Sequence, residues 1–148
     1  MQPWDTIIIH HTFKHGIPDS PEFLDWSGIV NYHKGILGWD DVGYHYGIER
    51  VAHRLVICPG RTTLREGAHC KAQHMNYRAI GIACVGNYDS FPPDEKLYSL
   101  TAHLCHFLVC KYPAIKVDRV LPHSDFSGKT CPGTKFDMDK LRGLIGGS

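Results

Sequence analysis

Short apolar runs alternate along this chain with longer segments of helical periodicity. The run "TIIIH", residues 6–10, is rich in β-branched residues and is typical of a fully buried strand. "AIGIACVG", residues 79–86, is a second such run, and "VDRVLPH" supplies a third strand. "GYHYGIE" and "RLVIC" are predicted to pair around residues 51–53. Because strands and helices alternate, we expect an α/β fold with a central mixed sheet flanked by helices.

Three segments are predicted to be helices. "DSPEFLDWSGIVNYHKG" predicts a helix from about residue 20 to 34, with Asp19 or Ser20 as its N-cap. The longest helix is expected in "PPDEKLYSLTAHLCHFLVCKYP", where apolar residues share one face and Pro113 ends the helix. That face consists of Leu97, Leu100, Leu104, Phe107 and Leu108. A short terminal helix is expected in "DMDKLRGLI".

The size and charge of the chain narrow the classes of protein to which it can belong. Its 148 residues suit one domain, so we treat 1–148 as a single domain. The 16 Lys and Arg residues nearly balance the 15 Asp and Glu residues, so charge offers no case for a nucleic-acid partner. No apolar run approaches the roughly 18 residues of a membrane span, and we expect no membrane insertion. The N-terminus lacks the regions of a secretory signal, which predicts synthesis in the cytoplasm.

The six cysteines are expected to be free thiols, because their number is modest for this length and no secretory signal is visible. Cys84, Cys105 and Cys110 fall in apolar patterns and are predicted to fill the core. Cys131, in "KTCPG", lies instead on a polar Pro-Gly turn. That context favours reactivity or metal binding over packing.

Two histidines stand at the ends of predicted strands. His10 ends the first strand and His123 ends the last one, and Cys131 follows eight residues later. Two imidazoles and a thiolate are a ligand set that zinc accepts, and three protein ligands leave a position for water. We therefore predict one catalytic Zn²⁺ at the strand ends, and hydrolysis of an amide or ester. Two alternatives stay open: His11 could be the ligand in place of His10, or Cys131 could be a nucleophile with a histidine base.

Four motifs in order resemble one known family. "IIIHHT", "GWDDVGYHYGIE", "GAHCKAQHMNYRAIGIACVGN" and "PHSDFSGKTCPGTKFD" are similar to motifs of the zinc-dependent N-acetylmuramoyl-L-alanine amidases of the second type. That family includes phage amidase-type lysozymes and peptidoglycan recognition proteins. The resemblance implies the zinc ligands His10, His123 and Cys131. It also implies that Tyr44 hydrogen-bonds the bound water or the oxyanion, and that Lys129 stabilises negative charge on the tetrahedral intermediate.

Other positions refine or depart from the pattern. By the same resemblance His69 lines the substrate cleft, and we expect Trp39 to pack beside the cleft and rim it. Recycling amidases have an aspartate ligand and a glutamate after "IGI", where this chain has Cys131 and Ala83. This places the chain with the phage lysozymes and leaves its general base unassigned. The Asp-Gly hairpin usual in relatives is replaced by "RVAHRLVICPGR".

The resemblance predicts the substrate and the reaction. We expect a monomeric enzyme that hydrolyses the lactyl-L-alanine amide of peptidoglycan. Without a secretory signal, the expected role is a phage or prophage endolysin that reaches the cell wall after a separate protein permeabilises the membrane. A non-catalytic peptidoglycan-binding module and a muropeptide-recycling amidase are the alternatives within the family.

Overall fold

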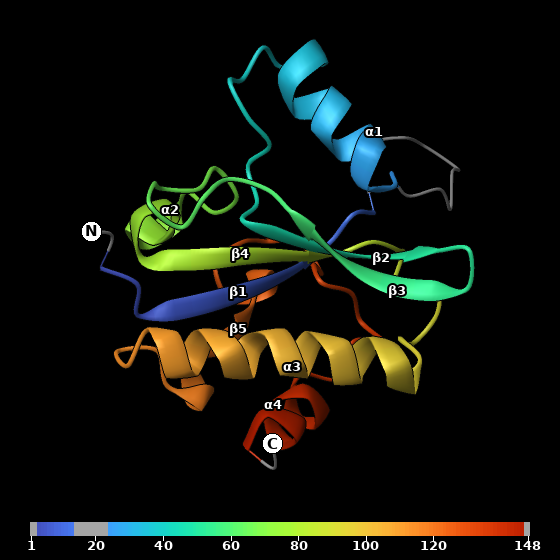
Figure 1. The fold of residues 1–148 in the computed structure, drawn as a ribbon, viewed down its shortest axis with the longest axis vertical. Helices are drawn as coiled ribbons and strands as arrows, with labels where there is room; N and C mark the ends of the chain where they lie inside the picture. Colours follow the sequence, from blue (N-terminus) through green and yellow to red (C-terminus); the bar gives the residue numbers. More distant parts are fainter. Residues whose placement is uncertain (1–2, 14–23, 147–148) are drawn as a thin grey trace.

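A computed structural model describes residues 3–13 and 24–146 (Figure 1). The strands are β1 (Thr6–His11), β2 (Tyr46–Val51), β3 (Arg54–Pro59), β4 (Ala79–Cys84) and β5 (Val120–Pro122). The α-helices are α1 (Trp26–Asn31), α2 (Met75–Arg78), α3 (Glu95–Lys111) and α4 (Met138–Gly146). Shorter segments are the π-helix η1 (Tyr32–Ile36) and the 3-10 turns η2 (Ala72–His74), η3 (Val117–Arg119) and η4 (His123–Asp125). None of the described helices is long and apolar enough to span a bilayer.

The strands form one five-stranded sheet in the order β3-β2-β4-β1-β5. β2 and β3 are antiparallel, whereas β1 runs parallel to both β4 and β5. The predicted mixed sheet is therefore confirmed. All six residues of β1 are buried, which accounts for its continuous apolar run. Because β1, β4 and β5 are parallel, their carboxyl ends lie along the same edge of the sheet.

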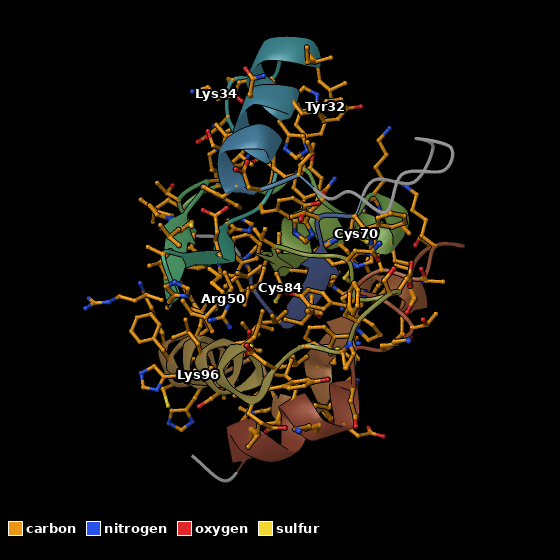
Figure 2. The ribbon with its side chains drawn as sticks, turned by 90° about the vertical axis from the view of Figure 1, so that its right-hand side faces the viewer. Tyr32, Lys34, Arg50, Cys70, Cys84 and Lys96 are labelled. Atoms are coloured by element: carbon orange, nitrogen blue, oxygen red, sulfur yellow. The ribbon has the colours of Figure 1, made fainter. Side chains whose placement is uncertain are left out.

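Helices cover the two faces of the sheet unequally. Figure 1 shows α3 and α4 on one face, and α1 and α2 on the other. Successive side chains of a strand point to opposite faces. Thus Ile7 and Ile9 join the large core beside α3, whereas Ile8 joins a smaller cluster with Cys70 and Met75 near α2. Figure 2 shows Cys84 inside the molecule, with Arg50 and Lys96 toward its periphery.

The β2–β3 hairpin turns without the Asp-Gly pair of the relatives. Ala52 and His53 occupy the turn with φ of 48° and 70°. Positive φ at both central residues is the geometry of a type I′ turn, whose twist matches that of the flanking strands. The predicted pairing around residues 51–53 is confirmed. Ala52 and His53, and not Asn or Gly, adopt the positive φ of the turn.

The first predicted helix needs correction. Among the described residues, Leu24 and Asp25 are non-helical and α1 begins at Trp26; the Asp25 side chain caps it by accepting from the Gly28 N–H at 2.7 Å. The proposed caps Asp19 and Ser20 lie outside the described residues. The helix also continues as a π-helix to residue 36.

The helix α3 is the longest of the described helices, as predicted, but two residues that were predicted to be buried face solvent. Phe107 is 52% exposed, and Cys110 is exposed rather than buried in the core. Thr101 and Cys105 take the buried positions instead, because the stripe that faces the sheet runs 97, 101, 104, 105 and 108. All six cysteines are free thiols, as predicted.

Candidate metal centre

Parallel strands place the first two donors side by side. Ile9 of β1 is paired with Pro122 of β5, so the residues that follow, His10 in β1 and His123 in η4, stand at the same edge. Their ring centroids are 4.4 Å apart. His10 is buried and His123 half-buried. The sequence prediction that two strand ends bring these histidines together is therefore consistent with the fold.

The loop after η4 brings Cys131 to the same point. The Ser124 N–H donates to the Cys131 carbonyl at 2.7 Å, which ties the loop to the segment that carries His123. The His11 N–H donates to the Cys131 Sγ at 3.3 Å. That sulfur lies 3.7 Å from the Nδ1 of His10. Cys131 is only 6% exposed, although its neighbours along the sequence are polar.

These three residues fit a zinc ion. His10, His123 and Cys131 each offer one donor atom, and the three atoms lie within 4.8 Å of one another. Burial lowers the pKa of His10 well below its usual range and that of His123 to about 4, so both imidazoles keep a lone pair for a metal. Burial raises the pKa of the Cys131 thiol to about 12, so metal binding there must displace a proton.

His11 belongs to different surroundings. Its Nδ1 accepts a hydrogen bond from the Tyr88 N–H at 3.1 Å, and its ring stacks near the Tyr88 ring. Adjacent residues of β1 face opposite sides, so His10 and His11 cannot both point into the cluster. Within the described chain, the metal-capable group of three contains His10 and not His11.

The two residues expected to act on substrate lie beside the donors. The Tyr44 ring, just before β2, is 4.9 Å from the His10 ring. Burial, with a smaller contribution from Cys131, raises the pKa of Tyr44 above its usual value, so its hydroxyl stays a hydrogen-bond donor. Lys129 is exposed and lines the cavities on both sides of the donors.

A second layer of side chains surrounds the donors. The Nδ1 of His69 lies 2.9 Å from the Nε2 of His10, and the His69 N–H donates to the Asn76 Oδ1 at 2.7 Å. The Trp39 ring packs 4.6 Å from the ring of His33. His33 lies beside Tyr44, with the two ring centroids 5.7 Å apart. Its place in the π-helix, a rare element often found at functional sites, is visible only in the structure.

Two cavities adjoin at the cluster: all three donors line the smaller one, and His123 also lines the larger one. One has a volume of about 240 Å³ on the α1 side, and the other about 720 Å³ on the α2 side. Residues that line both cavities are His33, Tyr44, His123 and Lys129. Trp39 and His69 line the larger one. Of the described residues along both cavities, none is an aspartate or glutamate, whereas Lys71 joins Lys129 in the larger cavity.

Comparison with known proteins places this geometry in a family. The model of the family described as N-acetylmuramoyl-L-alanine amidase matches residues 1–134. Peptidoglycan-recognition protein SC1a of Drosophila melanogaster is 30% identical over 115 residues, which cover 78% of this chain and 59% of that protein. The endolysin of Enterobacteria phage T3 is 33% identical over 110 residues, which cover 70% of this chain and 65% of the endolysin. The chain thus spans less than two thirds of the length of these relatives.

Solved structures agree with the sequence comparison. The endolysin N-acetylmuramoyl-L-alanine amidase LysCS of Clostridium intestinale has a TM-score of 0.77 and 27% identity, covering 98% of this chain and 85% of that one. A mutant of Drosophila PGRP-LB in complex with tracheal cytotoxin has a TM-score of 0.72 and 26% identity, covering 92% and 79%. By sequence, fold and extent of the match, this chain belongs to the N-acetylmuramoyl-L-alanine amidase family.

Proposed function

We propose that the protein is a zinc-dependent N-acetylmuramoyl-L-alanine amidase that hydrolyses the amide between the lactyl group of muramic acid and L-alanine in peptidoglycan. The observation that carries the proposal is the convergence of His10, His123 and Cys131 where two cavities meet. A zinc ion bound there would polarise the scissile carbonyl and lower the pKa of water. Family membership supports amide hydrolysis as the reaction.

The residues of the chain would hold the substrate and its developing charge. The protonated hydroxyl of Tyr44 would donate a hydrogen bond to the carbonyl oxygen; the contact of its ring with that of His10 supports this role. The ammonium group of Lys129, at the junction of the cavities, would stabilise the same negative charge. No carboxylate lines the described cavities, so neither role is shared with an acidic side chain.

The shape of the cleft suits an extended substrate cut near its middle. Cavities on both sides of the donors would accommodate the glycan on one side of the amide and the stem peptide on the other. Lys71 and Lys129 favour a stem peptide that carries carboxylates. The PGRP-LB structure with tracheal cytotoxin and the Clostridium endolysin support a cell-wall fragment as substrate.

An endolysin role follows from the phage relative. The match to the T3 endolysin supports a role in which the protein is made in the cytoplasm and degrades the cell wall after release. A membrane-permeabilising partner would release it. Three complete donors argue against a non-catalytic binding module. Cys131 and Ala83, in place of aspartate and glutamate, argue against muropeptide recycling. The raised pKa of Cys131 argues against a thiol nucleophile, which needs a lowered one.

Digestion of purified sacculi tests the proposal. The zinc-loaded protein should release new amino groups that belong to L-alanine, and Cys131→Ser should release none. A chelator should abolish activity and added zinc should restore it, whereas a thiol enzyme would ignore the chelator. Release of reducing sugars without new L-alanine amino groups would show a glycosidase and contradict the bond assignment.

A further inference from the structure

We propose that His69 is a positioning residue for the metal centre, because it sets the tautomer of His10 so that Nδ1 presents its lone pair to the donor cluster. The inference rests on the proposed zinc function. It assigns His69 to the support of a ligand, in addition to its place in the wall of the larger cavity. The hydrogen-bond partners of the two rings carry the argument.

A backbone carbonyl begins the chain of hydrogen bonds. The Nε2 of His69 lies 2.9 Å from the Ala79 oxygen. A carbonyl oxygen can only accept, so Nε2 of His69 must carry the hydrogen. In a neutral imidazole the other nitrogen is then an acceptor. The Nδ1 of His69 is therefore left with a lone pair that faces His10.

The lone pair of His69 determines the state of His10. The two facing nitrogens, Nδ1 of His69 and Nε2 of His10, are 2.9 Å apart, so Nε2 of His10 must be the donor. The hydrogen of His10 then sits on Nε2, and its Nδ1 keeps a lone pair. That Nδ1 is the nitrogen 3.7 Å from the Cys131 sulfur. Partners of this kind commonly orient metal-bound imidazoles.

The backbone around His69 is shaped to hold the ring. A Cβ added to Gly67 would lie 2.5 Å from the His69 Cδ2, and one added to Gly81 would lie 2.6 Å from the same atom. The ring thus occupies a slot between two glycines. The Asn76 side chain holds its backbone by accepting from the His69 N–H at 2.7 Å. Both ring nitrogens already have protein partners, so the ring has no nitrogen left for a substrate.

Substitution of His69 directly tests the chain of hydrogen bonds from the Ala79 carbonyl through His69 to His10. His69→Phe keeps a ring of similar size but removes both hydrogen bonds, and it should weaken zinc binding roughly 10- to 100-fold in competition with a chromogenic chelator. His69→Asn retains an acceptor near the position of Nδ1 and should recover most of the affinity. In metal-free protein, ¹H–¹⁵N correlation spectra should show His10 as the Nε2–H tautomer, and His69→Phe should produce a mixture.

Substitution of Gly81 provides a test that leaves the His69 residue unchanged. Gly81→Ala should displace the ring and weaken zinc binding in the same way. Gly143→Ala in α4 is the matched control and should leave zinc binding unchanged, because a Cβ there meets no atom within 4 Å. Circular dichroism of each variant checks that it is folded.

Two outcomes would overturn the inference. One is wild-type zinc affinity in His69→Phe with His10 still the Nε2–H tautomer. The other is a higher KM for peptidoglycan with unchanged zinc affinity, which would assign His69 to substrate binding instead of to the support of His10. A wild-type protein that binds no zinc would contradict the proposed function instead. The tautomer measurement on metal-free protein would still decide the role of His69.

Discussion

The two faces of the sheet are built differently by the same strands, and β4 shows the contrast best. Its residues toward α3 are large and apolar, with Ile80 and Ile82 in the main core. Its residues toward the metal centre are small. Gly81 leaves room for the His69 ring, and Ala83 is paired in register with His10. A single strand thus supplies packing on one face and space for imidazoles on the other.

This division separates stability from function. The α3 face buries most of the large apolar side chains, and burial of such side chains is the dominant favourable term in folding. The opposite face holds the donor cluster, whose histidines remain neutral because they are buried. Substitutions on the two faces should therefore change different measured quantities.

The largest effect is expected on the face of the sheet that holds His10, His123 and Cys131, called the metal face below. His123→Ala should lower amidase activity about 1,000-fold or more, equivalent to about 4 kcal/mol, because one of three donors is lost. Its metal-free form should unfold at nearly the wild-type denaturant concentration, since His123 is only half-buried. Activity and urea unfolding are measured on the same preparation. A large loss of stability in the metal-free variant would contradict the view that the two faces serve stability and function separately.

The face of the sheet covered by α3, called the core face below, should show the converse: a loss of stability without a loss of zinc affinity. Leu108 of α3 is fully buried in the main core, and Leu108→Ala should lower the free energy of unfolding by roughly 2–5 kcal/mol. Zinc affinity at temperatures where the variant is folded should stay close to wild type. Chemical denaturation and chelator competition measure the two quantities. A zinc affinity that falls together with stability would mean that the faces are coupled.

Lys129 tests charge stabilisation on the metal face. Lys129→Ala should lower kcat roughly 10- to 100-fold, at the lower end for loss of a group that stabilises an oxyanion, because the side chain is exposed to solvent. Stability should not change. Lys135→Ala is the matched control, since Lys135 is also exposed but lies outside both cavities. Equal losses in the two variants would exclude a specific role for Lys129.

His45 should show that a histidine near the metal face can serve stability alone. Its Nδ1 accepts from the Gly81 N–H at 3.1 Å, and its Nε2 lies 3.0 Å from the Arg65 carbonyl. Burial lowers the pKa of His45 to about 4, below that of an unfolded histidine. The unfolded chain therefore binds the proton first, and the stabilising contribution is present above about pH 6.5 and lost as the pH falls toward about 4.

The loss should be on the order of 3 kcal/mol across that range. In His45→Gln the slope of stability against pH should become smaller by the contribution of His45, while His10 and His123 still contribute. His103→Gln on the exposed side of α3 is the control and should keep the wild-type profile. Unfolding in urea between pH 4 and pH 7 measures the effect. An unchanged slope in His45→Gln would assign the acid loss to other groups.

Periodicity and strand ends were enough to predict much of this molecule. Buried runs predicted β1 and β4, and the polar residues after strands predicted that His10 and His123 meet. The contact between His69 and His10 could not be predicted, because strand periodicity gives the face of a residue and not its neighbours from a distant loop. The exposure of Phe107 was missed because the buried face of α3 also includes Tyr98, Thr101 and Cys105, so that face is turned away from Phe107.

The catalytic roles of Tyr44 and Lys129, and the ligand roles of the three donors, stay predictions that depend on zinc. X-ray absorption at the zinc edge of the loaded protein tests them most directly. We expect one zinc per chain, with a single sulfur at about 2.3 Å and nitrogen or oxygen neighbours at about 2.0–2.1 Å. Cys131→Ser should remove the sulfur contribution. A zinc shell without sulfur in the wild-type protein, or a protein that retains no zinc, would contradict the account.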